Sequence, residues 1–171
     1  MAVMLSTLLA PLSLLASKSG VLSAGARAAL GRYLGALRRR VETDLGALPD
    51  RAALILGHTH KPFAELWTGD GWPPGGLGVA NTGGWVVDHH EAQPLAGGAV
   101  ALVSDELDVA LVRLYQQLED PAHWRIDVET PDGAASEFAE GIRKLIDPGS
   151  APWSTFSAAA AGLVAERRRD L

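Results

Sequence analysis

Two histidines, His58 and His60, have the side chains and the spacing of a metal-binding pair. They follow an apolar run at residues 52–56, which is typical of a short strand buried on both faces. Side chains two positions apart in an extended segment point to the same side, so both imidazoles can converge on one site. His-x-His spacing alone can arise by chance in a chain with five histidines. The prediction of a metal pair therefore depends on the strand that precedes it.

A second apolar strand, predicted at residues 78–80, leads into the segment Asn-Thr-Gly-Gly-Trp that begins at Asn81. Ligands of α/β sheets gather just past the carboxyl ends of strands, and Gly57 permits the chain to turn tightly where the first strand ends. Asn81 either caps the turn that follows it or orients His58 or His60 through a hydrogen bond. The sequence leaves both roles open.

The two segments together resemble the closing signature of the calcineurin-like metallophosphoesterases. The resemblance rests on an apolar strand followed by Gly-His-Thr-His-Lys-Pro and, later, a strand entering Asn-Thr-Gly-Gly-Trp, and it covers residues 52–115. It implies the C-terminal half of an αββα sandwich and a divalent metal pair of Mn, Fe or Zn, whose bridging hydroxide attacks a phosphoester. It further implies that His58 binds the second metal and His60 the first.

The chain departs from the family pattern at the earlier motifs. No Asp-x-His precedes His58, which is the first histidine of the chain, and neither Gly-Asp-x-x-Asp nor Gly-Asn-His occurs. Two imidazoles leave most of two coordination spheres to water, which is a poor basis for fixing a nucleophile. We therefore expect that this chain is the C-terminal part of a phosphoesterase, that Met1 is an internal methionine, that the N-terminal half of the domain is missing, and that the chain alone is inactive.

The remaining sequence predicts the elements that flank this site. Apolar residues at three- and four-residue steps predict an amphipathic helix over residues 23–48. Two strands, 99–103 and 109–114, are separated by a polar hairpin turn, and two helical pieces follow. The predicted class is α/β (α+β). We divide the chain into a helical segment at 1–48, a β-rich core at 49–118 and a C-terminal helical extension at 119–171, with helices near 134–146 and 154–169.

Composition narrows the classes of partner. The formal net charge is −5 and the sequence pI is about 5.5, so no global positive field attracts nucleic acid. There are no cysteines, which leaves nitrogen and oxygen atoms as metal ligands. The apolar stretch from Met1 to Ala16 is too short for a membrane span, is interrupted by Pro11 and lacks a preceding positive charge. We expect a cytoplasmic protein without clear membrane association.

Two other charged clusters invite a functional interpretation. Asp88-His89-His90-Glu91 is rich in possible ligands, but it lies in a segment that is typical of a surface turn, and adjacent histidines diverge on an extended chain. Arg38, Arg39 and Arg40 are followed by Glu42 and Asp44, which indicates a solvated helix face with opposite charges within reach of each other. Phosphate binding by the arginines is the alternative.

A function from another class also fits the sequence. The chain would then be a non-catalytic scaffold or interaction domain that keeps the fold without a working metal centre. A Ser-His-Asp hydrolase is excluded, because the chain has no Gly-x-Ser-x-Gly elbow. The phosphoesterase and the scaffold remain the two hypotheses.

Overall fold

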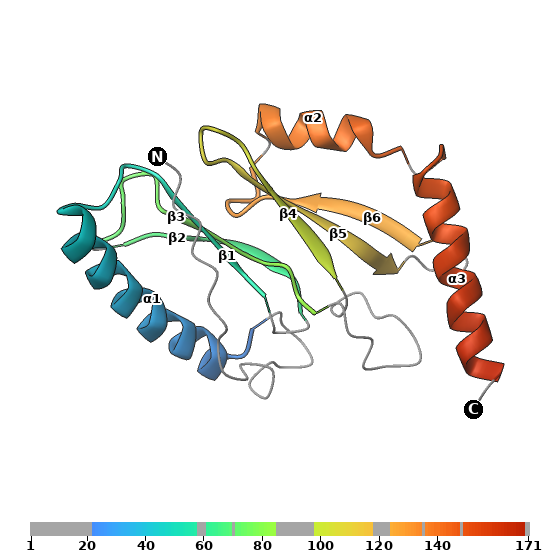
Figure 1. The fold of residues 1–171 in the computed structure, drawn as a ribbon, viewed down its shortest axis with the longest axis horizontal. Coiled ribbons are helices and arrows are strands. Elements are labelled where there is room, and N and C mark those ends of the chain that lie inside the picture. The colour runs from blue at the N-terminus through green and yellow to red at the C-terminus, as the bar shows by residue number, and fades with distance from the viewer. Residues whose placement is uncertain are drawn as a thin grey trace.

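A computed structural model describes residues 22–57, 61–69, 71–84, 98–117, 124–134, 136–147 and 149–169. Over these ranges the chain forms an α+β fold, as the sequence predicted (Figure 1). The elements, in chain order, are α1 (Ala24–Leu45), β1 (Ala52–Leu56), β2 (Phe63–Trp67), β3 (Leu77–Asn81), β4 (Ala99–Val103), β5 (Val109–Gln117), β6 (Trp124–Glu129), α2 (Glu137–Leu145) and α3 (Trp153–Arg169).

The strands form two three-stranded sheets. In the first sheet, with the order β1-β3-β2, the central β3 pairs parallel to β1 and antiparallel to β2. In the second sheet, with the order β4-β5-β6, all pairs are antiparallel. An isolated bridge between Gly83 and Gly98 joins the end of β3 to the start of β4, so the two sheets meet at that corner.

Three apolar clusters hold the layers together. Leu30 and Leu34 of α1 pack on one face of the first sheet, and α2 and α3 pack on β5 and β6 of the second. Between the sheets lies a cluster that includes Ala80, Ala99 and Leu111. The layers therefore follow the order helix, sheet, sheet, helix, and Figure 1 shows α1 and the α2–α3 pair on opposite sides of the strands.

Local sequence signals set the helix boundaries. The α1 helix begins after Ser23, whose Oγ accepts a hydrogen bond from the Ala26 N–H at 3.1 Å. It ends at Gly46, which adopts φ 81° and donates its N–H to the Glu42 carbonyl. This glycine ends the helix at Leu45, before the predicted end at residue 48. Ser136 caps α2 in the same way as Ser23, with 3.1 Å between its Oγ and the Ala139 nitrogen.

The structure contains a strand that the sequence analysis did not predict. β6 lies in the region where only helices were expected, and it completes the second sheet by pairing with β5. Ile126 and Val128 are buried beneath α2 and α3, whereas Asp127 and Glu129 alternate with them. This alternation, Trp-Arg-Ile-Asp-Val-Glu, was the available signal for a half-buried strand.

The other predictions for the flanking elements are confirmed. β4 and β5 form the expected hairpin, and its turn is closed by Ser104, whose Oγ accepts hydrogen bonds from the Glu106 and Asp108 N–H groups. The predicted C-terminal helices correspond to α2 and α3. Within the described ranges, no helix is both long and apolar enough to cross a membrane.

We expect that replacing Gly76 by alanine destabilises the fold by about 3 kcal/mol, since a left-handed φ is strained for alanine. Gly76 has φ 76°, and an added Cβ would lie 2.8 Å from Leu66 Cδ1 and 3.1 Å from the Trp67 carbonyl oxygen. The matched control is Gly46→Ala, because Gly46 has φ 81° and open space around it, so about 1–2 kcal/mol is expected there. Urea denaturation of both variants checks the difference, and equal losses would show that the contacts at Gly76 carry no cost.

Candidate metal centre

The carboxyl ends of β1 and β3 lie side by side because the two strands run parallel. Leu56 is in register with Asn81, so the chain leaves both strands at the same edge of the first sheet. Thr82 fastens the two ends together: its N–H donates to the Leu56 carbonyl at 2.8 Å, and its Oγ1 donates to the same oxygen at 3.2 Å. The two motifs that carry the family resemblance therefore begin at neighbouring positions.

The predicted ligands His58 and His60 lie outside the described residues, as does Thr59 between them. The structure places the residues on either side, Gly57 and Lys61, but it does not test whether the two imidazoles converge. Their role as metal ligands stays a prediction. The cluster at residues 88–91 also lies outside the described ranges.

Asn81 is the buried polar residue that organises this edge. It is fully buried, and its Nδ2 donates to the Lys61 carbonyl at 3.0 Å while its Oδ1 accepts from the Gly83 N–H at 3.1 Å. The second bond closes the turn after β3, in which Gly83 adopts φ 69°. The turn-capping role is thus confirmed, and the orientation of a histidine by Asn81 stays a prediction.

The Asn81 amide also bonds to the residue that follows the histidine motif. Its bond to Lys61 reaches the residue directly after His60, while Thr82 holds Leu56, two residues before His58. Leu56 and Lys61, on either side of the histidine motif, are therefore both bonded to the turn after β3. A buried hydrogen-bonded amide of this kind rigidifies its surroundings, because leaving its partners without hydrogen bonds is costly.

The sequence suggested that glycine is needed at position 57 for a tight turn, but the backbone conformation at Gly57 does not require a glycine. It does not adopt a left-handed φ, and an added Cβ would lie 3.6 Å from Thr82 Oγ1, an ordinary van der Waals contact. The tight turn in this region uses Gly83 instead, because Gly83 is the glycine with a positive φ at this edge. Alanine at position 57 is therefore sterically acceptable.

Arginines on α1 are engaged in local contacts. Arg38 donates to the Gly71 carbonyl at 2.8 Å and lies 3.7 Å from Glu42, and Arg40 forms an ion pair with Asp44 at 2.8 Å. The predicted face of opposite charges within reach of each other is confirmed. Such exposed pairs contribute little to stability.

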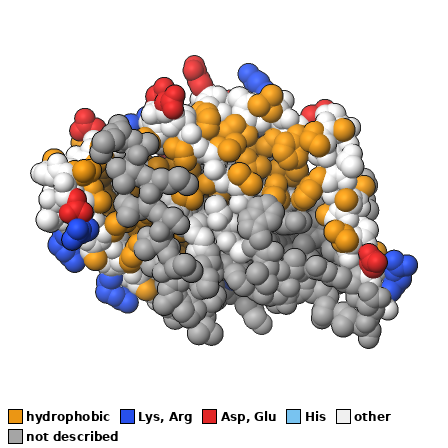
Figure 2. Space-filling model, viewed as in Figure 1, with side chains coloured by type: hydrophobic (Ala, Val, Ile, Leu, Met, Phe, Trp, Pro, Cys, Tyr) orange, Lys and Arg blue, Asp and Glu red, His pale blue; other side chains and the backbone are white. Residues whose placement is uncertain are grey.

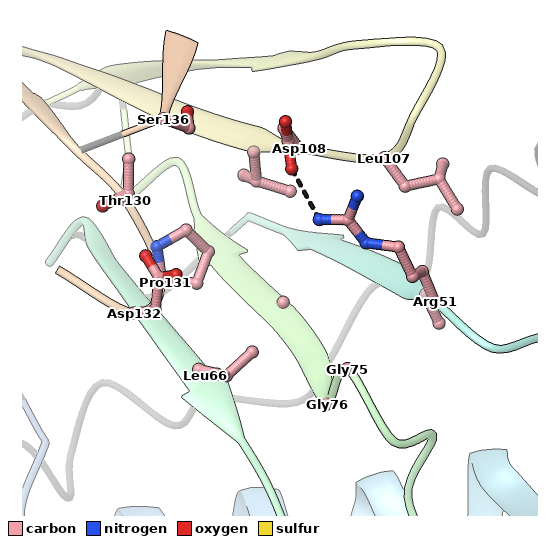
Figure 3. Close-up of a pocket in the computed structure, with 13 residues that line it drawn as sticks. Arg51, Leu66, Gly75, Gly76, Leu107, Asp108, Thr130, Pro131, Asp132 and Ser136 are labelled. Atoms are coloured by element: carbon pink, nitrogen blue, oxygen red, sulfur yellow. Dashed lines mark hydrogen bonds and ion pairs between the residues drawn. The ribbon is translucent and has the colours of Figure 1, made fainter. Parts of the chain in front are cut away.

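A cleft of about 90 Å³ opens at the other end of the sheets, where β1 begins (Figure 3). Its rim carries an ion pair in which Arg51, just before β1, contacts Asp108, just before β5, at 2.6 Å. The loop after β6 closes the other side with Thr130 and Asp132. The sequence analysis missed this cleft because its lining comes from five separate regions of the chain, and no local pattern joins them.

Among the residues that the structure describes, no group of three or more His, Asp, Glu or Cys side chains is placed to hold a metal ion. The residues described at this edge, Gly57, Lys61 and Asn81 to Gly84, include no carboxylate. Comparisons with protein-family models, with curated proteins and with solved structures find no match to this chain.

Proposed function

We propose that this chain contributes His58 and His60 to the divalent metal pair of a calcineurin-like metallophosphoesterase. The observation that supports the proposal best is the buried Asn81 amide, which links the residue after His60 to the turn after β3. The two sequence motifs that suggested the family are thereby physically joined at one sheet edge. The helix, sheet, sheet, helix order of the layers is also what the resemblance implies.

In this proposal the chain holds metals and does not complete the reaction. The metal pair would be Mn, Fe or Zn, and it would supply an activated water for attack on phosphorus. The residues of the chain would hold the metal ions and orient the ligands. The two imidazoles would act as neutral ligands, and Asn81 and Thr82 would restrain the segment that carries them. In this proposal the carboxylate ligands come from outside the described residues. A cytoplasmic location stays a prediction from the sequence.

Calorimetric titration with Mn²⁺ tests the proposal. We expect the 171-residue chain to bind Mn²⁺ and the double variant His58→Ala/His60→Ala to lose that binding, because imidazole nitrogens are the proposed ligands. His123→Ala is the matched control, since it removes a histidine outside the motif and should leave binding unchanged. Binding that survives loss of both motif histidines would contradict the proposal, and no binding by the parent chain would favour the non-catalytic scaffold.

Hydrolysis of a generic aryl phosphate gives a second, independent result. We expect no Mn²⁺-dependent turnover by this chain alone, since two imidazoles cannot fix a nucleophile between two metal ions. The measurement is the release of phenolate over time at saturating Mn²⁺. Robust turnover that depends on His58 and His60 would show that the chain carries a complete site, and would overturn the claim that further ligands are needed.

A further inference from the structure

The outer face of α1 carries two arginines that point away from the fold. Leu30 and Leu34 of α1 are buried against the first sheet, whereas Arg32 and Arg39 are exposed on the opposite side of the helix. The two arginines are seven residues apart, which is two helical turns and about 10 Å along the helix axis. The residues between them on this side, at positions 35 and 36, are glycine and alanine. No bulky side chain of α1 therefore separates the two guanidinium groups.

The positive charge of these two arginines is not offset within the described part of the chain. Each of the other three arginines of α1 has a carboxylate partner: Arg27 with Glu65, Arg38 with Glu42, and Arg40 with Asp44. Arg32 and Arg39 form no such pair with another described residue. α1 contains five arginines and two acidic residues, a net charge of +3, in a chain whose net charge is −5. The helix is thus a local basic surface on an acidic molecule.

The charges of α1 are not arranged to stabilise the helix itself. Its acidic residues, Glu42 and Asp44, lie near its C-terminal end, where the helix dipole is unfavourable for negative charge. Each of them pairs with an arginine four residues before it, which is the weaker orientation of such a pair. Local ion pairing therefore does not account for the outward Arg32 and Arg39, whereas a negatively charged partner would.

Any partner that covers this face must bring negative charge. Arginine is almost never buried without a paired charge, so an apolar segment does not cover Arg32 or Arg39. Residues 1–21, which precede α1 in the chain, contain no Asp or Glu and cannot pair with them. The apolar interior of a folded domain is excluded for the same reason. The outer face of α1 is therefore a surface for a charged ligand and not a packing face of the fold.

The size of this basic surface favours a short acidic protein segment over an extended polyanion. Arg32 and Arg39 span about 10 Å, and Glu42 and Asp44 follow toward the end of the helix. A nucleic acid or a lipid membrane extends well beyond that length and would meet like charge there and over the rest of an acidic chain. Before Leu45, no large apolar side chain of α1 is exposed, so nothing on this face inserts into a membrane.

A helix is the conformation that matches the spacing of the arginines. When two helices lie side by side, carboxylates seven residues apart on one meet arginines seven residues apart on the other, because both patterns repeat after two turns. Guanidinium and carboxylate groups pair through two parallel hydrogen bonds. The small residues at positions 35 and 36 let the backbone of a second helix approach.

We propose that the outer face of α1 docks an acidic helix of a partner protein, in which two carboxylates seven residues apart pair with Arg32 and Arg39. The proposal is independent of the metal centre, since it uses only the side of α1 that faces away from the first sheet.

Binding of a designed acidic peptide to the full chain tests the proposal. The probe is a fluorescently labelled, helix-forming peptide with two glutamates seven residues apart, and fluorescence anisotropy measures its affinity at low ionic strength. We expect Arg32→Gln/Arg39→Gln to weaken binding about tenfold or more, because the charge-assisted hydrogen bonds are lost. Arg38→Gln/Arg40→Gln removes the same charge from arginines that are already paired, and should weaken binding much less. Circular dichroism checks that each variant is folded.

Two outcomes of this experiment contradict the proposal. The first is that the parent chain does not bind the peptide at low ionic strength. The second is an equal loss of affinity in the two folded double variants, which would show that the peptide responds to net charge alone.

A second series of ligands tests the spacing and the class of the partner. A peptide of the same composition, with its two glutamates on opposite faces of the helix, should bind the parent chain as weakly as the first peptide binds Arg32→Gln/Arg39→Gln. A single-stranded RNA and vesicles that contain phosphatidylserine should also bind more weakly than the first peptide. Equal binding of the two peptides overturns the helical spacing, and tighter binding of the RNA or the vesicles overturns the choice of a protein partner.

Discussion

Replacing Leu34 by alanine is expected to lower the free energy of unfolding by about 2–5 kcal/mol, the range for deleting a buried leucine side chain. Leu34 is fully buried, and it packs with Leu30 against Val79 at the centre of the first sheet. The truncated side chain leaves a cavity between α1 and the sheet, because the neighbouring side chains come from two rigid elements and relax only in part. Urea denaturation followed by circular dichroism measures the loss.

Leu45→Ala on the same helix is the matched control for this prediction. Leu45 is 49% exposed, so its truncation should change the free energy of unfolding by less than about 1 kcal/mol. Both substitutions replace a leucine of α1 by alanine, so the two variants differ chiefly in how deeply the lost side chain was buried. Similar losses for the two variants would mean that α1 does not depend on this packing, and the account of the first core would then be wrong.

Replacing Asn81 by leucine is the second large effect, with an expected loss of about 3 kcal/mol in the free energy of unfolding. The change leaves the Lys61 carbonyl and the Gly83 N–H without their side-chain partner at a buried site. A polar group that is buried without a hydrogen-bond partner raises the free energy of the folded state, because it has lost its bonds to water and gained none in the protein. Because Asn81 anchors the segment after His60, we also expect Mn²⁺ affinity to fall roughly tenfold or more, as it does when groups that support metal ligands are removed.

Thr82→Val is the control for Asn81→Leu, because it removes a different hydrogen bond at the same edge of the first sheet. Valine removes the hydroxyl bond to the Leu56 carbonyl but keeps the backbone N–H bond to the same oxygen. The expected loss is therefore about 1 kcal/mol, with little change in Mn²⁺ affinity. If Asn81→Leu proved no more costly than Thr82→Val in either measurement, Asn81 would not be the organiser of this site.

Much of the fold could be predicted because its signals are local. The apolar run at Ala52–Leu56 and the leucine spacing of α1 each indicate a buried face, and each pattern lies within a single strand or helix. The turn between β4 and β5 was predicted from its polar residues, and Ser104 closes it as such turns require. The end of α1 was predicted too late, because the left-handed Gly46 ends the helix before the proline that had marked its end in the sequence.

The rest depends on contacts between segments that are distant in the chain. β6 carries charged residues that made its region resemble a surface, although Ile126 and Val128 alternate with them and are buried by α2 and α3. The bond from Asn81 to Lys61 joins residues twenty positions apart, and no spacing rule predicts it. The position of β1 at the end of its sheet, among the strands that the structure describes, follows only from the strand order, because the same apolar run is also typical of a central strand.

One uncovered face also became visible only in the structure. Figure 2 shows hydrophobic side chains gathered in the angle between α2 and α3. On β4, Val100 and Leu102 are each 39% exposed, whereas Ala99 is buried between the sheets. The sequence of β4 is apolar throughout and therefore does not reveal which of its faces meets another layer.

The central claim is that His58 and His60 bind a divalent metal at the edge formed by β1 and β3, and paramagnetic broadening by Mn²⁺ tests it most directly. In two-dimensional amide spectra of the labelled chain, we expect substoichiometric Mn²⁺ to erase the signals of Gly57, Lys61 and Gly83 first, and to leave those of α3 unaffected. The His58→Ala/His60→Ala variant should keep all of these signals. Broadening that persists in this variant, or that centres on residues 88–91 instead, would contradict the claim.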